Sequence, residues 1–294
     1  MPENKQPEWL ADATFYEIYP QSFQDTNADG IGDIPGIIKR LDYIKELGCN
    51  AIWLNPCFLS PFGDAGYDVE DYYTVAPRYG TNEDLAHLFE EAHKRDMHVI
   101  LDLVPGHTAV THKWFKESMK AKKNEYTDRY VWTDCIWEEP QGMNCIRGIS
   151  DRDGSCAVNF FSHQPALNYG FYTQERDWQQ PQDAPGPQAT LEAMKDVMRF
   201  WLTMGCDGFR VDMAGSLVKN DPDSKGTIKL WQNVREFLNA EFPKAAMVSN
   251  RTNRFLAVSI WISCFILDHL IITICSAVKN RSSLHAVREM YLYL

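Results

Sequence analysis

The chain has 294 residues, of which 45% are hydrophobic and 23% charged, a composition typical of a globular protein with one large core or two domains. Its formal net charge of −11 and the lack of a basic run argue against nucleic-acid binding. Aromatic residues make up 13% of the chain, which suits either an aromatic core or a cleft where sugar rings stack.

The cysteines and the N-terminus indicate a cellular compartment. None of the eight cysteines belongs to a C-x-x-C pair, which argues against a zinc site. Cys49, Cys57 and Cys206 lie in apolar sequence and are expected to be small core residues. Residues 1–6 contain no apolar signal region, so we expect reduced thiols and a cytoplasmic location.

The first third of the chain alternates between strand and helix patterns. Strands are predicted at 15–19, 51–54 and 98–104. One helix is expected from its cap at Asp33 to Gly48, and a second helix begins at Thr81. The spacing is typical of parallel β/α units.

The alternation stops after the third strand. Residues 107–189 show no helical period and are too many for a loop, so they predict a small inserted domain. The pattern then resumes with helices around 191–202 and 230–238 and strands at 208–213 and 245–249.

The predicted fold is therefore α/β: an incomplete (β/α)8 TIM barrel, strands 1 to 5, with a small domain inserted after strand 3. The expected division is 1–106 for the first part of the barrel, 107–189 for the inserted domain, 190–249 for the rest of the barrel and 250–294 for an apolar tail. A doubly wound α/β fold is the alternative, weakened because no G-x-G-x-x-G follows the first strand.

The stretch 208–213 contains the strongest candidate site. Arg210 and Asp212 are two residues apart on a strand and so share one face, where the guanidinium can hold the carboxylate ionised. An ionised carboxylate at a strand end suits a nucleophile for sugar chemistry. A structural ion pair is the alternative.

Two further motifs follow strand ends. His107 comes after the third strand, where its imidazole can donate to a substrate hydroxyl. Asp64 and Tyr67 come after the second strand and offer acceptors for hydroxyls and a flat face for a pyranose ring. Ordinary turn chemistry is the alternative for this second motif.

The loop before the first predicted helix carries oxygen side chains at alternate positions. Such spacing around a glycine turn suits a hard cation such as Ca²⁺, although Gly36 stands where an EF-hand has its bidentate Glu. A polar loop of Asx turns is the alternative. The predicted Ca²⁺ site consists of Asp25, Asn27, Asp29, Ile31 and Asp33.

Together, and in this order, the motifs resemble the α-amylase family of retaining glycoside hydrolases (family 13). The resemblance runs from about Phe15 to Ser249 and rests on 25–33, 63–72, 102–108, 164–168 and 208–213. It implies a (β/α)8 barrel with a domain inserted after strand 3. It also implies hydrolysis or transfer of α-glucosidic bonds in α-glucans or oligosaccharides, with retention of configuration.

The resemblance also implies roles for single residues. Asp212 corresponds to the nucleophile and Arg210 to its positioning partner. Asp64, Tyr67 and His107 correspond to contacts with the sugar ring at the cleavage point. The N-terminal loop corresponds to the family's calcium loop. The expected partner is an α-glucan or oligosaccharide substrate, with no nucleic acid and no membrane.

Three departures from the family pattern have consequences. Gly106 replaces an Asn that often binds a second calcium, and 215–216 replace a Lys-His pair of starch-cleaving members, which favours oligosaccharides. Asn250 stands where the acid/base Glu is expected after strand 5, and it cannot donate the required proton. The family's later His-Asp pair is missing too, because Asp268 and His269 have the reverse order and come too early.

From Asn250 the chain changes character, and 255–278 is nearly all apolar. A transmembrane helix would fit this length, but Asp268 in mid-span would be costly. We prefer a reading-frame shift after Ser249, which truncates the barrel and leaves little or no activity. A non-catalytic carbohydrate-binding or transport-accessory protein is the alternative, weakened because Asp212 is retained.

Overall fold

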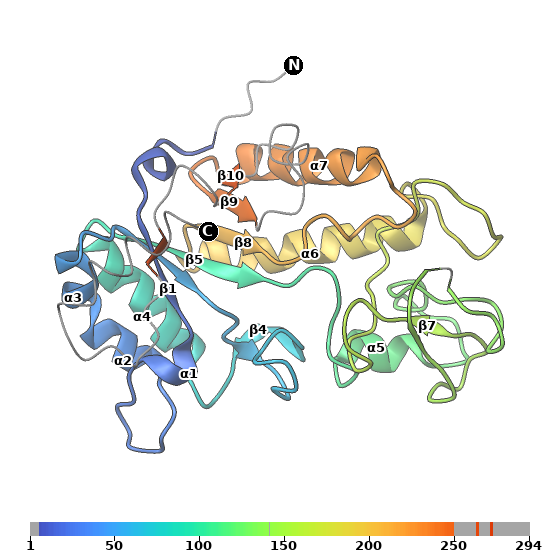
Figure 1. Cartoon of the computed structure of the whole chain (residues 1–294), viewed down its shortest axis with the longest axis horizontal. Helices are drawn as coiled ribbons and strands as arrows, with labels where there is room; N and C mark the ends of the chain where they lie inside the picture. The colour runs from blue at the N-terminus through green and yellow to red at the C-terminus, as the bar shows by residue number, and fades with distance from the viewer. Residues whose placement is uncertain (1–5, 141, 250–262, 265–270, 273–294) are drawn as a thin grey trace, which may run out of the picture.

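The computed structural model describes residues 6–140, 142–249, 263–264 and 271–272. Its centre is a parallel sheet with the strand order β10-β9-β8-β5-β2-β1-β11 (Figure 1). The longer strands are β1 (Phe15–Ile18), β2 (Ala51–Leu54), β5 (His98–Leu103), β8 (Gly208–Val211) and β9 (Ala246–Ser249). Two-residue strands, β10 (Ser263–Cys264) and β11 (Ile271–Ile272), lie at its edges. The five predicted strands of the (β/α)8 barrel are confirmed.

Helices connect the parallel strands, as the crossover geometry requires. They are α2 (Ile34–Lys39) and α3 (Leu41–Glu46) before β2, α4 (Asn82–His93) before β5, α6 (Pro185–Thr203) before β8 and α7 (Lys225–Glu241) before β9. Their apolar faces pack on the sheet, and Trp201 and Trp231 are fully buried there. The indole N–H of each donates to a backbone carbonyl, so neither polar atom is left unpaired.

The predicted helix starts are confirmed, but one predicted helix is wrong. Asp33 caps α2 by accepting from the Gly36 amide at 2.7 Å, and Thr81 caps α4 in a capping box with Asp84. The helix expected from Asp33 to Gly48 is broken at Arg40, whose φ is −108° and ψ is 4°. The Arg40 amide bonds to the Ile37 carbonyl three residues back, which tightens the chain there.

Shorter elements escaped prediction because they have too few residues for a periodic pattern. They are η1 (Glu8–Asp12), α1 (Pro20–Phe23) and the antiparallel hairpin of β3 (Phe58–Leu59) and β4 (Asp71–Val75). Residues 107–189 contain α5 (Lys113–Ser118), β6 (Cys145–Ile146) and β7 (Cys156–Ala157). The boundary expected at residue 189 falls inside α6, because the prolines near its start are tolerated in a first turn.

The remaining predictions concern cysteines and membranes. Cys49, Cys57 and Cys206 are buried, as expected, and they are free thiols. Among the described residues, no helix combines the length and the apolar character that crossing a membrane demands. The expected apolar tail, Asn250 and the frame shift lie outside the described residues, apart from β10 and β11.

An ionic cluster joins α4, β5 and β8 at the N-terminal end of the sheet. Asp207 Oδ2 lies 2.8 Å from His93 Nε2 and its Oδ1 lies 3.0 Å from His98 Nδ1. The Asp207 carboxylate also accepts from the Val99 amide. The hydrogen bond between His93 and Asp207 raises the pKa of His93. Burial opposes ionisation of Asp207, but the bonds from His93 and His98 outweigh it and lower its pKa.

We expect Asp207→Asn to lower the free energy of unfolding by about 1–3 kcal/mol, most strongly in mildly acidic solution. The His93 contribution is complete below its ordinary pKa of 6.5 and is lost as pH rises through the raised value. The Asp207 contribution is present above pH 3.8, the ordinary pKa of an aspartate, and is lost as pH falls through the lowered pKa of the folded protein. Urea unfolding of both proteins from pH 4 to 9 measures this loss of stability. The control is Glu90→Gln, which removes the partner of the exposed His87. A stability difference between parent and Asp207→Asn that stays constant across that pH range would contradict the prediction.

Candidate active site

Three charged side chains meet at the C-terminal ends of β5 and β8. Arg210 Nη1 donates to Asp102 Oδ1 at 2.8 Å and Oδ2 at 3.0 Å, and to Asp212 Oδ1 at 3.1 Å. The register of β5 on β8 sets Asp102 directly beside Arg210. The Arg210 side chain is 3% exposed and that of Asp102 0%, whereas Asp212 is 16% exposed. Asp212 is therefore the most solvent-exposed member of this triad of Arg210, Asp102 and Asp212.

Asp102 is the residue that sequence reasoning did not name as part of the site. Its Oδ2 also accepts from the Trp53 indole at 3.0 Å and from the Tyr67 hydroxyl at 3.1 Å. Burial raises the pKa of Asp102, and the Arg210 guanidinium acts against that rise. A lone carboxylate in the apolar run of strand 98–104 was the available signal, since a buried charge needs a partner.

The triad sets the electrostatics of Asp212. Burial raises the pKa of Asp212, and Arg210 opposes this by charge and by hydrogen bonding. When both carboxylates are ionised, the one guanidinium that they share leaves a net charge of about −1 at this point. The Asp212 amide donates to the Leu103 carbonyl at 2.8 Å, which continues the pairing of β8 with β5 and fixes the backbone. The result is a positioned carboxylate at a strand end.

His107 and Tyr67 are tied together beside the triad. The His107 Nε2–H donates to the Tyr67 carbonyl at 3.1 Å, and its Nδ1 accepts from Asn159 at 3.2 Å. Burial lowers the pKa of His107 to about 4, so the ring is neutral at neutral pH. The structure thus gives protein partners to both ring nitrogens. The Tyr67 hydroxyl in turn accepts from Asn55 at 3.3 Å.

Asp64 stands on a loop that a second aspartate holds in place. Asp68 is fully buried and accepts from Ser60 Oγ and from the amides of Gly63 and Asp64 at 2.8–3.0 Å. Asp64 Oδ2 accepts from Gln164 Nε2 at 2.7 Å. Gln164 belongs to the inserted segment, so this segment contributes a contact to the site.

Asn159 and Lys219 complete the network and were also not predicted. Lys219 Nζ donates to the Ser216 carbonyl at 2.6 Å and to Asn159 Oδ1 at 3.4 Å. Burial lowers the pKa of Lys219 to about 8. A Cβ at Gly106 would lie 2.6 Å from the Asn159 amide nitrogen. The glycine at this position therefore makes room for Asn159 to reach His107.

The predicted calcium loop is folded by its own side chains. Asp25 accepts from the amides of Asn27, Ala28 and Gly30 at 2.7–3.0 Å, and the Gly30 bond contributes most to lowering the pKa of Asp25. Asp33 is engaged elsewhere, with Thr26 and the α2 cap. In the part of the chain that the structure describes, no three His, Cys, Asp or Glu side chains cluster as metal ligands. A Ca²⁺ site in this loop would therefore have to combine carboxylate oxygens with side-chain amide and backbone carbonyl oxygens.

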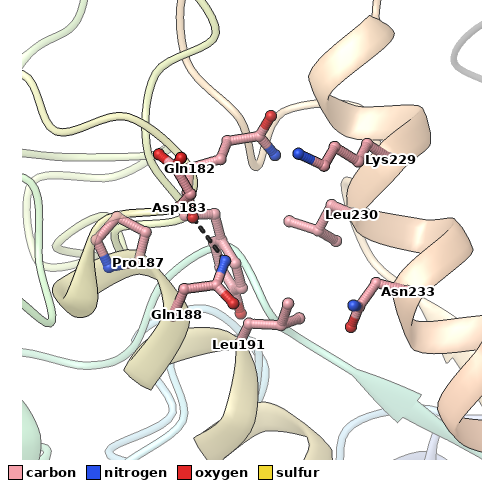
Figure 2. A pocket seen from close by; sticks show the side chains of 9 residues that line it. Gln182, Asp183, Pro187, Gln188, Leu191, Lys229, Leu230 and Asn233 are labelled. Carbon is pink, nitrogen blue, oxygen red and sulfur yellow. Dashed lines mark hydrogen bonds between the residues drawn. The ribbon is translucent and has the colours of Figure 1, made fainter.

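A small cavity lies between α6 and α7, and Figure 2 shows Gln182, Lys229 and Asn233 among the residues that line it. Its volume of about 70 Å³ accommodates a few water molecules but no sugar ring. None of the triad residues lines it. The cavity is therefore separate from the candidate active site.

Comparisons with known proteins identify the family of the chain. The family model "Alpha amylase, catalytic domain" matches residues 17–261, which continues past Ser249. The chain is 37% identical over 258 residues to the trehalose synthase/amylase TreS of Mycolicibacterium smegmatis, covering 82% of this chain and 40% of that protein. It is 39% identical over 219 residues to an oligo-1,6-glucosidase of Bacillus sp. (strain F5), covering 72% and 40%.

Solved structures show the same likeness in three dimensions. The trehalose-6-phosphate hydrolase of Bacillus licheniformis matches with a TM-score of 0.70 and 33% identity, over 86% of this chain and 46% of that one. The trehalulose synthase MutB of Pseudomonas mesoacidophila matches with a TM-score of 0.69 and 31% identity, over 84% and 45%. The chain spans about 40% of the length of the curated relatives. It belongs to the α-amylase family and carries part of that family's catalytic domain.

Proposed function

We propose that the chain belongs to a retaining glycosidase or transglycosylase that acts on α-glucosidic bonds, with Asp212 as the nucleophile. The bond from Arg210 to Asp212 Oδ1 at the end of β8 is the observation that carries this proposal. Short oligosaccharides are the proposed substrates, because Gly215 and Ser216 replace the Lys-His pair of starch-cleaving members. The relatives include an oligo-1,6-glucosidase, which points to the same class.

In the proposed first step, Asp212 attacks the anomeric carbon of the sugar. A bond forms between its carboxylate oxygen and that carbon while the glycosidic bond breaks, and the leaving oxygen takes up a proton. Arg210 holds the attacking carboxylate in place. Asp64 and the Tyr67 ring would hold the sugar, and His107 would fix Tyr67 through its carbonyl. Water or a second sugar then releases the glycosyl group with retained configuration.

The proton for the leaving group needs a second carboxyl group about 5–5.5 Å from the nucleophile. Asn250 stands at the family's position for this acid and has no acidic proton to give. Asp102 cannot replace it, because its oxygens accept from Arg210, Trp53 and Tyr67 in the interior. We therefore assign to this chain the nucleophilic half of the reaction.

A leaving group that needs no proton tests this assignment directly. Incubating the chain with 5-fluoro-α-D-glucosyl fluoride should add one fluoroglucosyl group, because fluoride departs without an acid. Intact-mass measurement detects the adduct, and peptide mapping should place it within 208–213. The β-anomer of the reagent is the control and should not react. A chain shown by circular dichroism to be folded, yet without adduct, would contradict the proposed nucleophile.

Carbohydrate binding without catalysis is the second candidate, and Asn250 is the observation that favours it. Isothermal titration with maltotetraose separates the two functions when it is combined with the labelling experiment. Saturable binding without an adduct supports the binder. An adduct at Asp212 supports the enzyme.

We also propose that Ca²⁺ binds the loop 25–33 through Asp25, Asn27, Asp29 and the Ile31 carbonyl. Calcium at about 100 times its dissociation constant should stabilise the chain by about 2.7 kcal/mol relative to EGTA, read as a higher Tm. Asp29→Ala should remove this difference, whereas the exposed Asp12→Ala should not. Asp33 is unsuitable for this test because its loss removes the α2 cap in any case. Equal Tm values in calcium and EGTA would refute the site.

A further inference from the structure

A groove of about 550 Å³ lies between the β3–β4 hairpin and α5, two elements whose positions are shown in Figure 1. Its sides come from the hairpin, from residues 111–117 and from Tyr126. Neither the triad residues nor Asp64, Tyr67 and His107 line it. The groove is thus separate from the candidate active site, and its volume falls within the range of small-ligand sites.

Fixed aromatic side chains line the groove. Tyr73 on β4 is partly exposed and packs edge-on against Phe200, with ring centroids 5.2 Å apart. Tyr126 is also partly exposed, and the Arg129 guanidinium carbon lies 5.6 Å from its ring centroid and 4.8 Å from that of Trp114. Rings held in this way lose little conformational entropy when a ligand packs on them.

The polar lining has both signs of charge and both kinds of hydrogen-bonding group. Glu70 accepts from the Thr111 hydroxyl at 2.8 Å. The other charged residues of the lining are Asp71, Glu117 and the exposed Lys113 and Lys116. Such a lining has no strong preference for an anion or a cation. It suits a neutral ligand whose hydroxyls both donate and accept.

A buried guanidinium lies against two of the aromatic residues that line the groove. Arg129 is 8% exposed, and no described residue accepts from its Nε or Nη1. Arg129 does not itself line the groove, so its contribution is to hold the Trp114 and Tyr126 rings against which it lies.

The hairpin links the groove to the catalytic network. Tyr72 lies between two groove residues on β4, and its hydroxyl donates to the carbonyls of Val104 at 2.7 Å and His107 at 3.0 Å. A ligand seated on this hairpin therefore rests on the same strand that supports His107.

We propose that this groove is a second carbohydrate-binding site, which holds a neutral gluco-oligosaccharide apart from the Asp212 site. The choice of ligand class rests on the proposed function, while the groove itself rests on its aromatic lining with charges of both signs. The site would hold one end of an oligosaccharide or an additional sugar chain near the catalytic network.

Indole N–H signals of the full chain can report on the two sites separately. Trp53 donates to Asp102 in the catalytic network, whereas Trp114 lines the groove. In Asp212→Asn protein, which cannot turn over, maltotetraose is titrated while the ¹⁵N-indole signals, assigned with single Trp→Phe variants, are followed. Both signals should shift, with different midpoints. Tyr126→Ala should weaken the Trp114 response about tenfold or more and leave that of Trp53 unchanged.

Two controls make the outcomes distinct. Tyr43→Ala, at an exposed tyrosine on α3, should change neither titration, whereas Asp64→Ala should weaken only the Trp53 response. A shift of Trp53 without any shift of Trp114 would overturn the second site and leave the proposed function standing. A Trp114 response that Tyr126→Ala does not weaken would also overturn it. Shifts at Trp114 alone would support the groove and count against the proposed catalytic site.

Discussion

Asp212→Asn is expected to abolish covalent labelling by the activated glucosyl fluoride, with the labelling rate falling at least about a thousandfold. The amide of asparagine is nearly the same size as the carboxylate but is not a nucleophile. Its carbonyl oxygen can still accept from Arg210, so the fold should be retained. The measurement is the time course of the adduct mass, with circular dichroism of both proteins.

The matched control for this variant is Asp223→Asn. Asp223 is an exposed aspartate in the segment after β8, where it pairs with Lys225. Its replacement should leave the labelling rate unchanged. Labelling of the Asp212→Asn protein at the parent rate would show that another group is the nucleophile, and peptide mapping would identify it.

Arg210→Leu is expected to lower the free energy of unfolding by about 3–5 kcal/mol, the largest stability effect we predict. The substitution leaves Asp102, whose side chain is 0% exposed, without its cation, and it removes the cation beside Asp212 as well. Urea unfolding at pH 7 measures the change. Arg199→Leu is the control, because that arginine is 38% exposed and its ion pairs should contribute about 1 kcal/mol or less.

The deficit of Arg210→Leu should also depend on pH. Burial raises the pKa of Asp102, and the loss of Arg210 removes the charge that opposes this rise. A carboxyl group with a raised folded pKa costs stability as pH increases above its unfolded value of about 4. The deficit should therefore be larger at pH 8 than at pH 5. The double variant with Asp102→Asn should recover part of the loss, and strict additivity would contradict the pairing.

The local framework of the chain was determined by its sequence. Unbroken apolar runs indicated the strands that became β2 and β5, because a parallel strand is buried on both faces. Asp33 and Thr81 indicated helix starts, because their side chains satisfy amides that the helix leaves free. The period of two placed Arg210 and Asp212 on one face. Each of these features depends on residues a few positions apart.

Only the tertiary structure decided which distant residues meet. Arg210 and Asp102 are 108 positions apart, and Gln164 and Asp64 are 100 apart. Their contacts depend on the register of β5 on β8 and on how the inserted segment returns to the barrel, neither of which leaves a periodic signal. The break at Arg40 has the same origin, since Ile37, Leu41 and Ile44 stay buried on both sides of it. Local patterns specify elements because their hydrogen bonds are local, whereas the partner of a buried charge is set by packing.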